Sequence, residues 1–110
     1  MEKLDLDRKA LELYEKMKGE FLQDEESKDV FARARNLVEP TLKEWADATI
    51  AYKLGPDGDR QINKDILKSC MNTIDNVQSG AKTYLKNYAL EKLGSLLKRV
   101  AVKYILPIVL

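Results

Sequence analysis

The chain has 110 residues, a formal net charge of +1, 45% hydrophobic residues and 34% charged residues. This length suits one domain, residues 1–110, that can bury a core without metal or disulfide cross-links. The composition is that of a folded helical protein, which excludes a disordered tail. The balanced charge provides no overall field to attract nucleic acid and argues against such a partner.

The first helical pattern runs from Leu4 to Leu22. Its apolar residues recur at intervals of three and four, which is the spacing of one face of an α-helix. A polar stretch, residues 23–27, interrupts the pattern, and a second helix is expected to begin near Ser27. The first apolar stripe consists of Leu6, Ala10, Leu13, Met17 and Phe21, widened by Leu11, Tyr14 and Leu22.

Pro40 interrupts the second helical pattern. Proline lacks a backbone N–H and crowds the preceding turn, so either the helix kinks there or a new helix begins at this residue. The pattern continues through Trp45 to Leu54. The apolar positions before the proline are Val30, Phe31, Ala34, Leu37 and Val38.

Two glycines and a proline within residues 55–59 predict the end of a helix. Two further helical patterns follow, one from Ile62 to Val77 and a longer one from Leu85 to Tyr104. The sequence therefore predicts an all-α fold, a small antiparallel bundle of four helices, or of five if Pro40 separates two.

Charge is distributed unevenly along the chain. Residues 1–30 carry ten acidic against six basic side chains, whereas residues 81–110 carry six basic side chains against Glu91 alone. Oppositely charged ends attract each other within a bundle or between neighbouring copies, and the basic end also suits an anionic membrane surface.

The last helical pattern changes its character after Ala101. On a wheel of 100° per residue, Val102, Ile105 and Leu106 fall on the side that is polar earlier in the helix, and Pro107 discourages continuation. A segment that is apolar all round needs cover on every side. Three forms of cover are open: the chain's own core, another protein chain or a membrane surface.

We therefore expect a protein-interaction module that associates with itself, with the C-terminal segment as its contact element. A peripheral lipid-binding or membrane-surface protein is the alternative. The candidate interaction residues are Lys98, Arg99, Val102, Lys103, Tyr104, Ile105, Leu106, Ile108, Val109 and Leu110.

The residue inventory disfavours catalysis and metal binding. The chain has no histidine and one cysteine, Cys70, which lies in an apolar stripe and is expected to be a buried, unreactive thiol. The stretch 57–63 resembles the middle of an EF-hand calcium loop, but Gly55 and Ile66 stand where its first and last ligands belong. We expect no enzyme activity, no metal and no cofactor. The single cysteine and the lack of a signal-peptide pattern favour a cytoplasmic location.

Overall fold

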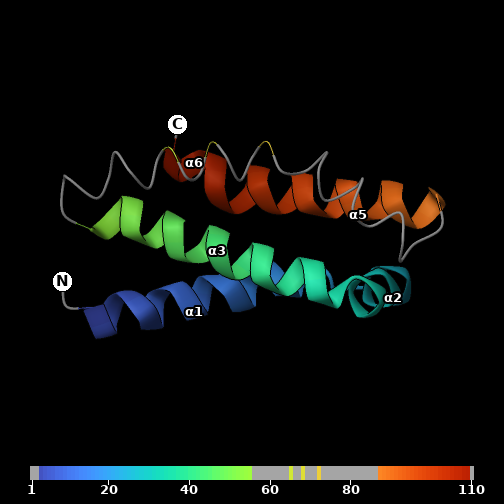
Figure 1. Ribbon diagram of the computed structural model, residues 1–110, viewed down its shortest axis with the longest axis horizontal. Coiled ribbons are helices and arrows are strands. Elements are labelled where there is room, and N and C mark those ends of the chain that lie inside the picture. Colours follow the sequence, from blue (N-terminus) through green and yellow to red (C-terminus); the bar gives the residue numbers. More distant parts are fainter. Residues whose placement is uncertain (1–2, 56–64, 66–67, 69–71, 73–86, 110) are drawn as a thin grey trace.

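A computed structural model describes residues 3–55, 65, 68, 72 and 87–109. These residues form α1 (Lys3–Gly19), α2 (Glu25–Arg33), α3 (Arg35–Leu54), α5 (Asn87–Val100), the π-helical turn η1 (Ala101–Ile105) and α6 (Leu106–Val109). The described residues contain no strand, and the predicted all-α fold is confirmed. Figure 1 shows α1 and α3 running in opposite directions, with α5 lying along them in the direction of α3.

The connection between α1 and α2 is short because each helix end has its own local signal. The N–H groups of Glu20 and Phe21 donate to the carbonyls of Met17 and Lys18, which closes the last turn of α1. Asp24 then caps α2, since its Oδ1 accepts the Ser27 N–H at 2.7 Å. A carboxylate at this end is also favoured by the helix dipole.

The boundary between α2 and α3 decides between the two alternatives that the sequence left open at Pro40. The two helices separate at Ala34, and Pro40 lies inside α3 without dividing it. The proline leaves the carbonyl of Asn36 without a helical donor, and both Asn36 and Pro40 lie on an exposed part of the helix. The hydroxyl of Thr41 donates to the Leu37 carbonyl at 2.7 Å and adds a hydrogen bond to the same turn.

The core lies where α1, α2, α3 and the C-terminal helices meet. Trp45 is its largest side chain and is 1% exposed. The rings of Phe21 and Phe31 pack at 5.9 Å with an angle of 52° between their planes, a tilted arrangement that aromatic pairs prefer. The other fully buried large side chains are Met17, Val30, Val38, Leu42, Leu93, Leu96, Leu97, Val100 and Ile105.

The predicted end of the long helix is confirmed, because α3 stops at Leu54. The Gly55 N–H donates to the Ala51 carbonyl at 2.8 Å, and a Cβ at Gly55 would collide with that same carbonyl oxygen. The helix predicted from Ile62 to Val77 falls almost entirely outside the described residues. Within it, Asp65, Lys68 and Asn72 are helical and exposed.

Candidate functional site

The described part of the C-terminal segment, residues 98–109, comprises the last turn of α5, η1 and α6, and Val100, Ala101 and Ile105 within it belong to the core. In the stripe predicted for the last helix, Leu93, Leu96, Leu97 and Val100 are buried, while Glu91, Ser95 and Lys98 on the other side are exposed. Leu85 and the side chain of Ala89 lie outside the described residues. The buried positions of α5 and η1 are Leu90, Leu93, Leu96, Leu97, Val100, Ala101 and Ile105.

The turn η1 explains why Ile105 reaches the core. The Leu106 N–H donates to the Ala101 carbonyl, five residues earlier, so one extra residue is accommodated in this turn. The following side chains are rotated backwards relative to a regular α-helix. Ile105 is 0% exposed, whereas Val102 remains 61% exposed. The α-helical wheel was therefore wrong for Ile105 and correct for Val102.

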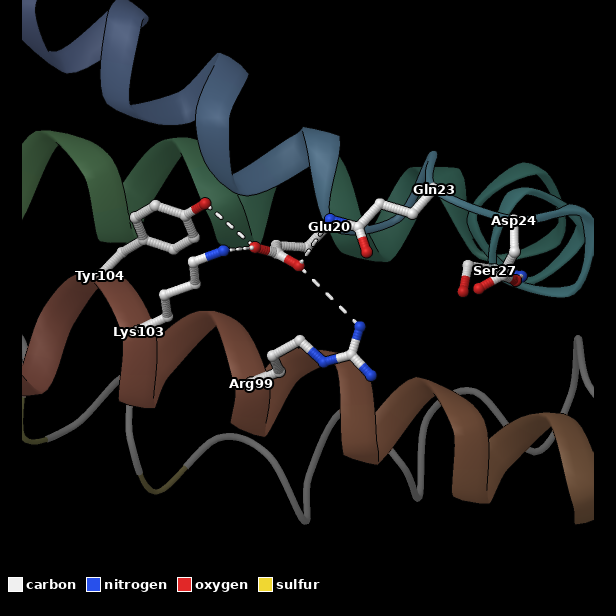
Figure 2. A network of polar contacts seen from close by, with 7 residues as sticks. All are labelled: Glu20, Gln23, Asp24, Ser27, Arg99, Lys103 and Tyr104. Atoms are coloured by element: carbon white, nitrogen blue, oxygen red, sulfur yellow. Dashed lines mark hydrogen bonds and ion pairs between the residues drawn. The ribbon is translucent and has the colours of Figure 1, made fainter.

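Glu20 connects the end of α1 to this segment (Figure 2). It is 2% exposed, and its Oε1 accepts hydrogen bonds from Lys103 Nζ at 2.6 Å and from the Tyr104 hydroxyl at 3.0 Å. Its other oxygen, Oε2, lies 3.9 Å from Arg99 and accepts a hydrogen bond from Gln23 Nε2 at 3.2 Å. A buried carboxylate is thus surrounded by donors on all sides, as its burial requires.

The network shifts the pKa values of its members. The hydrogen bond from Lys103 lowers the pKa of the Glu20 carboxyl, and the same bond raises the pKa of the Lys103 ammonium. Burial, followed by the hydrogen bond to Glu20, raises the pKa of the Tyr104 hydroxyl. Part of the charge opposition between the two ends of the chain is therefore satisfied within one molecule.

The predicted interaction residues have different surroundings. Lys98 and Val102 are exposed, the side chains of Arg99 and Lys103 are about half exposed and lie beside Glu20, and Ile105 is buried. Leu106 and Ile108 are half-buried, and so is Tyr104. Val109 ends α6 but its side chain lies outside the described part of the chain, as does Leu110.

Two leucines on α1 form an exposed surface that the sequence prediction missed. Leu4 is 77% exposed and Leu11 is 57% exposed, and they lie seven residues apart on one helix. Leu11 was assigned to the apolar stripe as one of the residues that widen it. On a helical wheel Leu11 lies about 100° from Ala10, which is buried. This offset could have identified Leu11 as an exposed residue.

The described residues contain no group of three or more acidic or cysteine side chains arranged to hold a metal ion. The calcium-loop-like stretch 57–63 and Cys70 lie outside the described residues. In the described part of the chain, no helix is both long enough and apolar enough to span a bilayer. Comparison with protein-family models, with curated proteins and with solved structures gives no match.

Proposed function

We propose that this protein is a non-enzymatic helical interaction module that forms a homodimer through the exposed face of α1. The proposal is carried by the exposure of Leu4 and Leu11, which lie two turns apart on the same helix face. Apolar side chains gathered on one exposed face favour contact with another protein over contact with water. Among the large apolar side chains that the structure describes as exposed, no other two share a helix.

Charges along α1 complement a second copy of the same helix. If two α1 helices pack antiparallel with the twofold axis beside Leu11, each Leu11 contacts its copy, and Arg8 lies opposite Glu15 of the second copy. Arg8 and Glu15 are both exposed on the flank beside the two leucines. The same register places Leu4 against Lys18 of the second copy, whose aliphatic stem packs on the leucine.

The proposed dimer is weak. With Leu4 77% and Leu11 57% exposed, burying all four leucines contributes about 4–8 kcal/mol at 1.5–3 kcal/mol per fully buried side chain. Association itself costs on the order of 4–15 kcal/mol, which offsets most of this gain. At the lowest association cost about 4 kcal/mol remains, so we expect a dissociation constant on the order of 1 mM.

In this proposal the contact surface differs from the C-terminal segment that the sequence favoured. Ile105 is buried by its own chain, and Lys103 and Tyr104 are engaged with Glu20. The alternative, a peripheral membrane-surface protein, retains the exposure of Val102 near Lys98. That surface offers little apolar area for insertion into a bilayer.

Sedimentation and light scattering between about 10 μM and 2 mM test the proposal. Leu11→Lys is expected to abolish association. Val102→Lys is the matched control, since Val102 is 61% exposed and Leu11 is 57% exposed, and it should leave association unchanged. Arg8→Glu and Glu15→Arg should each weaken the dimer, and the double variant should restore it because the pairs are exchanged.

Two outcomes would contradict this proposal. A wild-type chain that stays monomeric throughout the range rules out the dimer. Loss of association in Val102→Lys but not in Leu11→Lys makes the C-terminal segment the contact element. Binding of the wild-type monomer to anionic vesicles, abolished by Val102→Lys together with Lys98→Gln, would favour the membrane-surface alternative.

A further inference from the structure

A groove of about 310 Å³ lies between α1, the end of α3 and α6. Its apolar lining comes from Leu13 on α1, Ile50 and Leu54 on α3, and Ile108 on α6. Leu13, Leu54 and Ile108 are half-buried, so their remaining apolar surface faces the groove or the solvent. Because α6 contributes Ile108, the groove requires the C-terminal segment in its observed position.

The rim of the groove is predominantly basic. Lys9, Lys16 and Lys53 line it together with a single acid, Glu12. Lys9 and Lys16 lie two turns apart on α1, on either side of Leu13. Neither of these two lysines forms an ion pair within the described residues. The groove thus combines an apolar floor with a net positive charge at its edge.

We propose that this groove binds a free single-chain anionic amphiphile, such as a fatty-acid carboxylate. The alkyl chain lies on Leu13, Ile50, Leu54 and Ile108, and the carboxylate contacts the ammonium groups of Lys9 and Lys16. A volume of about 310 Å³ is at the lower end of the range for small-molecule pockets. The groove is too small for an amphipathic peptide helix, which needs several apolar anchor residues along two turns or more.

The head group and the chain length of the ligand test this assignment separately. Decanoate, decanol and decyltrimethylammonium are titrated into the full chain and followed by NMR chemical shifts. Decanoate should bind with a dissociation constant of the order of millimolar, decanol more weakly, and the cation not measurably. Octanoate should bind more weakly than decanoate by up to about fourfold per methylene lost. Added salt should weaken the binding of decanoate and not that of decanol.

Three variants locate the site. The double variant Lys9→Gln and Lys16→Gln should weaken decanoate binding about fivefold and leave decanol unaffected. Ile108→Glu, which adds a negative charge to the floor, should abolish decanoate binding while circular dichroism stays unchanged. Lys98→Gln removes an exposed lysine outside the groove and should change nothing.

Several results would overturn the assignment. Equal affinity for the three head groups would show that the alkyl chains partition onto the protein without recognition of the head group. Unaltered decanoate binding in the double lysine variant would exclude the proposed contact between the carboxylate and the two lysines. Binding to phosphatidylglycerol vesicles without binding of monomeric decanoate would identify a membrane surface as the ligand. Shifts at Leu13 and Ile108 that follow protein concentration alone would make a second copy of this chain the occupant.

Discussion

Replacement of Glu20 by glutamine should destabilise the fold. Glu20 is 2% exposed and its carboxylate accepts hydrogen bonds from Lys103 and Tyr104. Glutamine keeps the size of the side chain and one acceptor oxygen. It removes the charge, and it places an amide NH2 group where Oε1 or Oε2 accepts hydrogen bonds. Hydrogen bonds to charged groups contribute about 1.5–3 kcal/mol each when they are fully buried.

The expected loss is smaller than that upper value because the partners are partly solvated. The side chain of Lys103 is 57% exposed and that of Arg99 is 48% exposed, so water replaces part of their lost interaction. We expect Glu20→Gln to reduce the free energy of unfolding by about 1–2 kcal/mol. For a domain of this size the melting temperature should fall by about 4–12 °C. Thermal unfolding followed by circular dichroism measures the change.

The pH dependence of this loss identifies the carboxylate as its source. The pKa of Glu20 is lowered in the folded protein by the hydrogen bond from Lys103. Its stabilising contribution is therefore complete above the ordinary glutamate pKa of about 4.3 and is lost as the pH falls through the lowered folded value. The difference between wild type and Glu20→Gln should be constant from about pH 6 to 8 and should shrink below about pH 4.

An exposed glutamate provides the matched control. Glu91 is exposed on α5, and Glu91→Gln should change the free energy of unfolding by less than about 0.5 kcal/mol. If Glu20→Gln and Glu91→Gln have the same melting temperature as wild type, the polar network around Glu20 does not stabilise the packing of the C-terminal segment. A loss that stays constant down to pH 2 would show that the carboxylate charge is not its cause.

Two further substitutions test other contacts. Ile105→Ala should cost about 2–5 kcal/mol because the side chain is fully buried, whereas Val102→Ala on the exposed side of the same turn should cost less than about 0.5 kcal/mol, as measured by urea unfolding. Equal effects would mean that η1 does not direct Ile105 into the core. Asp24→Ala should cost about 1 kcal/mol through loss of the cap on the Ser27 N–H, while Asp24→Asn should cost much less because its side-chain oxygen still accepts that bond.

The helical stripes could be predicted from the sequence because they depend on local spacing. Met17 on α1, and Leu93 and Leu97 on α5, were assigned to core faces and are all 0% exposed. Phe21, which was assigned to the first stripe, is equally buried although it lies in the turn that follows α1. The end of α3 at Leu54 was equally predictable, since Gly55 provides a local stop signal.

The boundary at Ala34 could not be predicted by the same reasoning. Ala34 makes no side-chain capping hydrogen bond, and alanine favours helices, so the sequence contains no local signal for the break. Pro40 carries a strong local signal, but exposure of the affected turn and the Thr41 hydroxyl allow the helix to continue. Features other than local helix preference therefore decide at both positions whether the helix continues.

The candidate site was predictable only in part. The basic and apolar residues of the C-terminal segment were identified, but their partner Glu20 lies 83 residues from Lys103 in sequence and no local pattern connects them. The π-helical turn, which brings Ile105 to the core, shifts the helical register by one residue. A wheel that assumes regular α-helical geometry cannot anticipate this shift.

Distances between spin labels on two copies of α1 test the proposed dimer most directly. Labels are introduced in a Cys70→Ser background by Glu12→Cys or Lys16→Cys, both exposed and outside the proposed dimer contacts. With a rise of 1.5 Å per residue and about 10 Å between helix axes, an antiparallel pair centred beside Leu11 places the two backbones about 10 Å apart at residue 12 and about 18 Å apart at residue 16. Double electron–electron resonance at about 1 mM protein should therefore give a longer distance for Lys16→Cys than for Glu12→Cys. Equal distances at both positions, or no dipolar coupling between copies, would contradict the antiparallel α1 dimer.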